Sequence, residues 1–308
     1  MLEACLPTLG RTLAAMLLVA QAAGPPSPLA VAIQDRADAF HGVLGVAAKN
    51  LTTGESVFVN ADTRFPTASS IKTAILVEAF RQIGEGKLQR DQIVTLREDE
   101  KVGGSGVLTN LHAGLPLTLT DLLVLMITQS DNTATNMVVG LVGTANVNRT
   151  LESYGIVETK LFRPTFRQGK PDVLPELEKE FGLGMTTPRD MARLMELIAE
   201  KKAVTPQASE EMLEILKRQR YVDMIPRALP AEAVVGNKTG QDEEKLAGAD
   251  GRFRQVRADA AIVAGPKTRY VVAILTRQVD DTRFSVDNDA LVVGGAISRL
   301  IYDAFNTP

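Results

Sequence analysis

The sequence of 308 residues contains no tryptophan, a single cysteine and only two histidines. One cysteine, Cys5, cannot form an internal disulfide, and thiolate or cysteine-metal chemistry is excluded once the segment that carries it is removed. Neither His41 nor His112 accompanies a Gly-x-Ser-x-Gly motif, so a Ser-His-Asp hydrolase has no support. The chain also has no His-Glu-x-x-His motif and no glycine-rich phosphate loop. We therefore expect no metal and no cofactor.

Long runs of lysine or arginine are absent as well, and the net charge is only −3. Nucleic-acid-binding proteins and proteins that bind anionic membranes carry a clustered basic surface, which this sequence does not predict. A hydrophobic content of 45% with 23% charged residues is ordinary for a globular protein. We expect a monomer that binds a small molecule or a peptide, with no nucleic-acid partner and no stable membrane anchor.

The first residues are typical of an export signal. Arg11 precedes an apolar stretch over residues 13–20, and small residues follow before Pro25 and Pro26. The stretch is too short for a membrane span, which needs roughly twenty residues. We interpret residues 1–23 as a secretory signal peptide and 24–308 as the mature domain, which places the protein in a periplasm or outside the cell. The alternative interpretation is a buried core helix.

The remaining pattern predicts an α/β (α+β) fold in two lobes. Strand-like runs near each end of the chain enclose a long block of helical periodicity, so the most economical arrangement is one antiparallel sheet flanked by helices, with an all-helical lobe inserted into it. The α/β lobe is expected over about 30–65 and 205–308, and the helical lobe over about 66–204. The strand-like runs are 43–47, 55–59, 233–235, 260–263 and 270–275, and a closing helix is expected over 286–305.

Three short strings carry the chemistry, and their order matters more than any one of them. They are Ser69-Ser70-Ile71-Lys72, Ser130-Asp131-Asn132 and Lys238-Thr239-Gly240. Together they form the S-x-x-K, S-D-N and K-T-G set of serine acyl-transfer enzymes. Each string alone is weak, because S-x-x-K occurs by chance in many proteins.

The first string offers a nucleophile and a base. A serine hydroxyl attacks poorly unless a base lies within hydrogen-bond reach. Ser69 and Lys72 are three residues apart, so at the start of a helix both side chains lie on one face. Ser70 is the competing nucleophile, but a spacing of two turns it away from Lys72. A second buried cation such as Lys238 would lower the pKa of Lys72 and make it a base.

The other two strings offer a proton relay and an anion site. Ser130 can pass a proton to a leaving nitrogen, and Asn132 can hold an amide of the substrate. The alternative, purely structural interpretation is that this string only caps a helix. Lys238 and Thr239 can bind a carboxylate, and Gly240 lets a ligand approach the backbone. Arg257 is a candidate second cation for the same carboxylate.

With these motifs the chain resembles the class A β-lactamase family, including its non-lactamase relatives, from about residue 30 to 306. Further matching blocks are 66–72, 104–108, 130–136 and 186–188. The resemblance implies a β-lactamase/transpeptidase-like fold, an acyl-enzyme on Ser69, and Lys72 and Ser130 as proton carriers. It also implies Asn132 on the substrate amide, Lys238 with Thr239 on its carboxylate, and an oxyanion hole made by the backbone N–H groups of Ser69 and Gln241.

One block of the family does not match. In this family a Glu in an E-x-x-L-N block of the Ω-shaped loop activates the water that releases the acyl group. Alignment on Thr159-Lys160-Leu161 places Thr165 at the Glu position, whereas alignment on Pro175-Glu176-Leu177 places Leu174 there. Neither alignment keeps the block.

Three functions remain open at this point. In the first, Glu178 or Glu176 supplies the base and the protein hydrolyses β-lactams; the bland interpretation is that both lie on a solvated helical face. In the second, the protein is a D,D-peptidase-like enzyme, or another amidase or esterase, that β-lactams only acylate. In the third, it is a penicillin-binding sensor module. The expected partner is a β-lactam or a cell-wall peptide.

Overall fold

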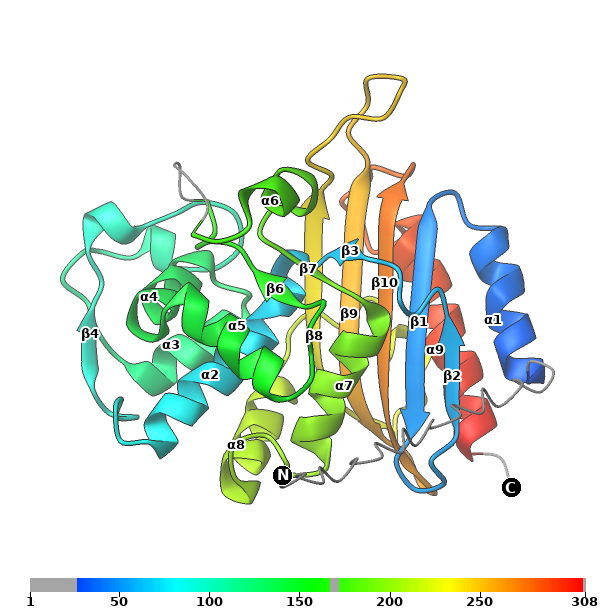
Figure 1. Ribbon diagram of the computed structural model, residues 1–308, viewed down its shortest axis with the longest axis horizontal. Coiled ribbons are helices and arrows are strands. Elements are labelled where there is room, and N and C mark those ends of the chain that lie inside the picture. Colours follow the sequence, from blue (N-terminus) through cyan, green and yellow to red (C-terminus); the bar gives the residue numbers. More distant parts are fainter. Residues whose placement is uncertain (1–26, 167–171, 307–308) are drawn as a thin grey trace, which may run out of the picture.

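The computed structural model describes residues 27–166 and 172–306. The predicted signal peptide, 1–23, lies outside the described residues. The architecture is the predicted α/β fold, with a sheet on one side of the molecule and most of the helices on the other (Figure 1). Among the described helices none has the length and apolarity that a membrane crossing requires.

The central sheet has five antiparallel strands in the order β2-β1-β10-β9-β8. Their bounds are β1 Val43–Asn50, β2 Ser56–Val59, β8 Val234–Glu243, β9 Gln255–Ala264 and β10 Arg269–Val279. Strands from both ends of the chain therefore pair directly, with β1 against β10 over eight residues from Val43 to Asn50. This pairing was expected from the strand-like runs at the two ends of the sequence. It leaves β8 at the edge of the sheet.

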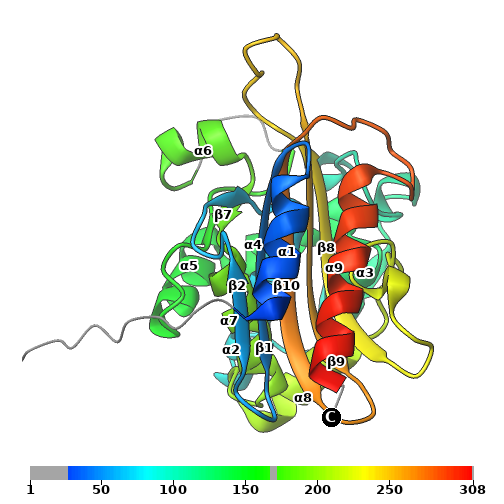
Figure 2. The ribbon, with the colours of Figure 1, turned by 90° about the vertical axis from the view of Figure 1, so that its right-hand side faces the viewer.

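Both faces of the sheet are covered, so β9 and β10 are buried along almost their whole length. On β10, Tyr270, Val272 and Ile274 pack on one side while Val271 and Ala273 pack on the other, as the period of two in a strand requires. Helices α1 (Pro28–Asp38) and α9 (Asp289–Asn306) cover the first face (Figure 2). Helix α7 (Pro188–Ala199) packs on the second, against β10, β1 and β9.

Beyond α7 the second lobe is built from helices around a shared apolar core. They are α2 Lys72–Gly84, α3 Leu119–Thr128, α4 Asn132–Val142, α5 Thr144–Ser153 and α8 Pro206–Leu216, with a shorter α6 at Pro175–Phe181. Their starts follow the expected cap chemistry: the Thr118 hydroxyl accepts from Asp121 N at 3.1 Å, and the Thr187 hydroxyl accepts from Asp190 N at 3.1 Å.

The segment 66–204 is not wholly helical, which differs from the all-helical lobe expected from the sequence. It contains two small sheets, β3-β7-β6 and β4-β5, with β3 at Phe65–Pro66, β4 Ile93–Thr95, β5 Pro116–Thr118, β6 Lys160–Leu161 and β7 Gly184–Thr186. Single-turn helices lie at η1 Ala68–Ile71, η2 Glu98–Glu100, η3 Leu108–Asn110 and η4 Pro226–Ala228. Strands of two or three residues are too short to show an alternating pattern, so these strands could not be predicted from the sequence.

Candidate active site

Ser69 lies in the turn η1, which leads directly into α2. The preceding Ala68 has a φ of 44°, a left-handed conformation that is unfavourable for a residue with a side chain. Such strain is characteristic of residues held for function. Ser69 lines a pocket, whereas Ser70 is buried and its hydroxyl donates to Thr67 O at 2.7 Å. Among the described residues the Ser69 hydroxyl has no such partner, so it is the serine that is free to react.

Lys72, the first residue of α2, is fully buried and reaches the second motif. Its Nζ lies 2.7 Å from Ser130 O, 2.8 Å from Asn132 Oδ1 and 3.1 Å from Ser130 Oγ. The Lys72 amine donates to all three of these oxygens. Lys72 therefore ties the start of α2 to the Ser-Asp-Asn motif.

Lys238 brings the third motif to the same hydroxyl. Its Nζ lies 3.2 Å from Ser130 Oγ and donates to Thr239 O at 2.8 Å. Burial is the main reason that the pKa of Lys72 falls well below its usual value, and the nearby charge of Lys238 lowers it further. Burial also lowers the pKa of Lys238 to about 7, although the carboxylate of Asp259 opposes that shift. Ser130 therefore stands between two amines whose pKa values are both lowered by burial.

The Ser-Asp-Asn string also caps a helix, as the structural interpretation of this string predicts. Asp131 is the N-cap of α4, and its Oδ1 accepts from Ala134 N at 2.9 Å. Its Oδ2 accepts from the backbone N–H groups of Val107 and Leu108 at 2.6 and 2.9 Å. The cap thus anchors the loop before η3 and leaves the side chains on either side of Asp131 directed at Lys72. Ser130 itself has a φ of 51°.

Gly240 is required where β8 passes close to η1, the turn that carries Ser69. A Cβ atom at this position would lie 2.6 Å from Thr67 O and 3.0 Å from Ser70 N, closer than real side chains come. Only glycine lets the edge strand approach η1 this closely. As a result Thr239 and Gln241, on either side of Gly240, line the same pocket as Ser69.

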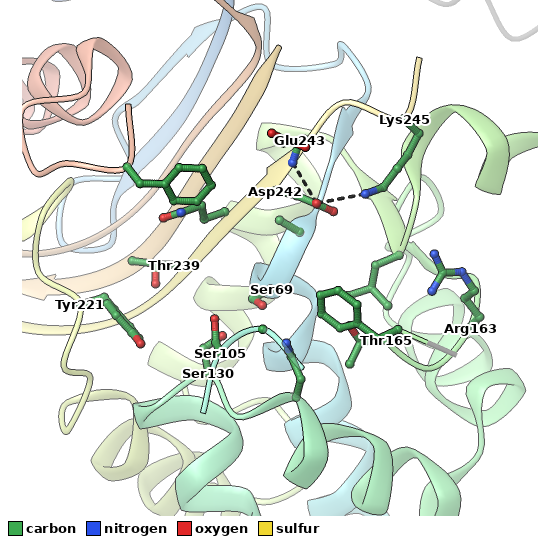
Figure 3. A pocket seen from close by; sticks show the side chains of 17 residues that line it. Ser69, Ser105, Ser130, Arg163, Thr165, Tyr221, Thr239, Asp242, Glu243 and Lys245 are labelled. Atoms are coloured by element: carbon green, nitrogen blue, oxygen red, sulfur yellow. Dashed lines mark hydrogen bonds and ion pairs between the residues drawn. The ribbon is translucent and has the colours of Figure 1, made fainter. Parts of the chain in front are cut away.

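The pocket has a volume of about 670 Å³ and separates two groups of side chains (Figure 3). Thr239 and Tyr221 lie on one side of Ser69, and Thr165 and Arg163 lie on the other. Ser105 and Ser130 lie below Ser69 in this view, and Asp242 lies above it, 3.0 Å from Lys245. Gly104 and Asn132 also line the pocket. In the described residues no cluster of histidine, cysteine or acidic side chains is suited to a metal ion.

Arg257 is not among the residues that line the pocket. Its side chain is buried and donates to Gln255 Oε1 at 2.8 Å and Val256 O at 3.0 Å, while its Nε has no partner within the described residues. The ring of Phe284, which does line the pocket, covers the guanidinium at 5.3 Å. The structure therefore places Arg257 behind the wall of the pocket, with Phe284 between it and a ligand.

Glu176 and Glu178 are not brought to the pocket either. The side chain of Glu176 is 82% exposed and pairs with Lys179 at 2.9 Å, one turn along α6. Glu178 pairs with Arg163 at 2.7 Å. Since neither carboxylate lines the space near Ser69, the geometry does not support the expectation that one of them is the deacylating base.

Thr165, and neither Glu176 nor Glu178, lies in the wall of the pocket. It is buried, and the side chain of Asn136 holds its backbone by donating to Thr165 O at 2.8 Å and accepting from Thr165 N at 2.8 Å. Of the two sequence alignments, the one anchored on Thr159–Leu161 therefore matches the structure. The carboxylates that do line the pocket are Asp242 and Glu243. Sequence reasoning missed both of these, because nothing local marks the end of β8 as a wall of the site.

The fold and the site together define a class A β-lactamase-like protein. The fold is a sheet with inserted helices, and the site is the cluster of Ser69, Lys72, Ser130 and Lys238. The model of the β-lactamase enzyme family matches residues 28–305, and the chain belongs to that family. This confirms the resemblance and the fold inferred from the sequence.

Similar proteins agree with this assignment. A β-lactamase of Streptomyces lavendulae is 28% identical over 64% of this chain, and the chain spans 64% of that relative's length. The β-lactamase PSE-4 of Pseudomonas aeruginosa is 25% identical over 86% of this chain and 85% of its own.

Two solved structures are similar over 91% of this chain and 98% of theirs. A β-lactamase from Sphaerobacter thermophilus is 31% identical with a TM-score of 0.76. A leucine-to-glutamate variant of PBP-A, solved as an acyl-enzyme with penicillin G, is 28% identical with a TM-score of 0.75.

Proposed function

We propose that the protein is a serine β-lactam hydrolase that opens the β-lactam amide by forming an acyl-enzyme on Ser69. The observation that carries this proposal is the buried Lys72 amine, which contacts both Ser130 and Asn132 and lies one helical turn from Ser69. β-Lactamases from two organisms and a penicillin G acyl-enzyme are among the similar proteins. We also propose that the protein is exported.

Acylation begins with a proton transfer. The neutral amine of Lys72 takes the proton of the Ser69 hydroxyl while Ser69 Oγ attacks the carbonyl carbon of the lactam. The carbonyl oxygen becomes an oxyanion, for which the backbone N–H groups of Ser69 and Gln241 are the proposed donors. Such donors stabilise the charge where it develops and require no reorganisation during the reaction.

Collapse of this intermediate breaks the carbon–nitrogen bond. Ser130 gives its hydroxyl proton to the leaving nitrogen and regains one from the Lys72 ammonium. The 3.1 Å contact between Lys72 Nζ and Ser130 Oγ is the path for that second transfer. Lys238 and Thr239 hold the carboxylate of the substrate, and Asn132 holds its amide.

Release of the acyl group needs an activated water, and here the site departs from the family pattern. Thr165 has a hydroxyl where a carboxylate base would be needed, and it is not a base at neutral pH. Of the two acidic residues that line the pocket, Asp242 is paired with Lys245, and Glu243 accepts a hydrogen bond from the amide of Gln255. We therefore propose that the acyl-enzyme forms readily and is released slowly.

A slow release also favours a second candidate function. An enzyme that transfers or hydrolyses cell-wall D,D-peptides uses the same acylation chemistry and is inhibited by β-lactams. The observation in its favour is the absence of a carboxylate from the loop wall at Thr165. The two functions are separated by offering a D-alanyl-D-alanine peptide and following release of D-alanine.

The experiment that tests the proposal is intact-mass analysis after mixing with penicillin G, on the wild type and two variants. Ser69→Ala should form no adduct. Ser70→Ala is the matched control: it removes a neighbouring hydroxyl that is bonded to Thr67 O, and it should still be acylated. An adduct on Ser69→Ala, or no adduct and no ring opening on the wild type, would contradict the proposal.

A further inference from the structure

Exposed aromatic side chains gather at the mouth of the pocket. The chain is poor in aromatic residues, with ten phenylalanines, four tyrosines and no tryptophan. Three of these fourteen line the pocket, and they are far from buried: Phe166 is 61% exposed, Phe284 72% and Tyr221 39%. Exposed apolar surface that borders a polar site is characteristic of a surface that binds a ligand.

Phe166 lies on the side of the pocket where an acyl side chain would extend. A Cβ atom on Gly104 would be 2.8 Å from the ring of Phe166 and 2.6 Å from Asn132 Nδ2. The ring of Phe166 and the amide of Asn132 thus both lie against Gly104, on the side where a Cβ atom would project. Because Asn132 is the proposed partner of the substrate's own amide, the next group of the substrate would meet Phe166.

The ring is presented by a strained backbone. Phe166 has a φ of 51°, in the left-handed region that bulky residues avoid. The two hydrogen bonds from Asn136 fix the preceding residue, Thr165, and so fix the point from which Phe166 projects. Strain of this kind persists only where surrounding contacts hold it, and it is concentrated at ligand sites.

Tyr221 and Phe284 lie on the other side of Ser69. Tyr221 is next to Thr239 across the pocket from Thr165 (Figure 3), and Phe284 covers Arg257. These two rings face the part of a substrate that carries the carboxylate and the leaving nitrogen. Phe166 is thus separated from them by the reacting serine.

Charge at the same mouth disfavours an anionic acyl side chain. Asp242 and Glu243 line this end of the pocket, and only Asp242 has an ion-pair partner, Lys245, in the part of the chain that the structure describes. Glu243 accepts from the neutral amide of Gln255 at 3.2 Å. Arg163 is paired with Glu178. One negative charge therefore remains without an opposite partner.

We propose that Phe166 is a specificity-determining residue, which selects substrates whose acyl side chain is an aromatic group without negative charge, and that Glu243 rejects anionic side chains. The aromatic ring of the substrate stacks on Phe166 while its amide is held by Asn132. This inference rests on the proposed acylation of Ser69 and names the substrate class of that same site.

The test compares second-order rate constants of acylation for three penicillins that differ only in the side chain: phenylacetyl, acetyl and phenylmalonyl. The wild type should prefer phenylacetyl over the other two. Phe166→Ala should lower the phenylacetyl rate constant by about fivefold to tenfold, as expected for loss of one aromatic contact, and leave the acetyl rate constant unchanged. The phenylacetyl rate constant of Phe166→Leu should lie between those of the wild type and Phe166→Ala.

Phe253→Ala is the matched control, because Phe253 is 51% exposed and is not among the lining residues of the pocket. Glu243→Gln should raise the phenylmalonyl rate constant selectively. Equal losses for phenylacetyl and acetyl in Phe166→Ala, or a wild type that acylates all three equally, would overturn this inference while leaving the acylation chemistry intact. A wild type that none of the three acylates would instead refute the proposed function, and this inference with it.

Discussion

Asn136 holds Thr165 at the pocket wall by two backbone hydrogen bonds of 2.8 Å each. The side chain of Asn136 is on helix α4, next to the Ser-Asp-Asn motif, so the loop that carries Thr165 is tied to the same helix that positions Ser130 and Asn132. Because Asn136 contacts only the backbone, the residue type at position 165 is free to change without loss of this anchor. Position 165 is therefore a place where the proposed release of the acyl group can be altered while the anchor of the loop is kept.

Thr165→Glu should convert a slow release into a faster one. A carboxylate at this point would face the ester on Ser69 and could activate a water, and general bases contribute on the order of 10² to 10⁴ in rate. We expect an increase in that range in the rate constant for loss of the penicilloyl adduct, measured by intact mass after the free penicillin is removed. Thr165→Gln, which has the same shape without a base, is the control. Equal release rates in the two variants would show that position 165 does not face the ester.

Replacement of Glu176 and Glu178 together by Gln should leave both acylation and release unchanged. Glu176 is almost fully exposed, Glu178 is paired with Arg163, and neither glutamate lines the pocket. A partly exposed ion pair contributes at most about 1 kcal/mol to the free energy of unfolding, so the double variant should fold. The measurement is adduct lifetime; a strongly prolonged lifetime with normal acylation would restore one of these residues as the base.

Two alignments of the loop were possible from the sequence, one anchored on Thr159–Leu161 and one on Pro175–Leu177. Only the structure decides between them, in favour of the first. The motifs that supply Ser69, Lys72 and Ser130 are local, because helix geometry brings residues three apart onto one face. Gly240 could also be understood in advance as a point of close approach. The positions of Glu178, Arg257 and Phe166 depend instead on how α6, β9 and the loop before α6 pack against distant segments, and no local pattern encodes that packing.

The rate of acylation should fall as the pH rises above about 7. Lys238 binds the substrate carboxylate as an ammonium ion, and burial lowers its pKa to about 7, so the charged form is progressively lost above that pH. Lys72 acts in its neutral form, and the lowering of its pKa by burial favours that form. We predict that Lys238→Arg moves the alkaline limb of the pH profile upward, since arginine stays charged. If the alkaline limb lies at the same pH in Lys238→Arg as in the wild type, the titration belongs to another group.

Gly240→Ala should damage the site more than the fold. The added Cβ would clash with Thr67 O and Ser70 N and push β8 away from η1. A misplacement on the order of 1 Å can cost about 10²-fold in rate, and an overpacked contact costs about 1–3 kcal/mol of stability. Gly140→Ala is the control, because a Cβ there meets no atom within 4 Å. The acylation rate and the melting temperature are measured for both variants. Normal acylation in Gly240→Ala would mean that the close approach of β8 to η1 is not needed.

The most direct test of the account is the time course of β-lactam ring opening by the wild type, followed by absorbance with penicillin in modest excess over enzyme. Acylation by Ser69 with slow release predicts a burst of about one equivalent per active site and then a much slower linear phase, with no burst in Ser69→Ala. Ring opening that is linear from the start over many turnovers, or that survives in Ser69→Ala, would contradict the account.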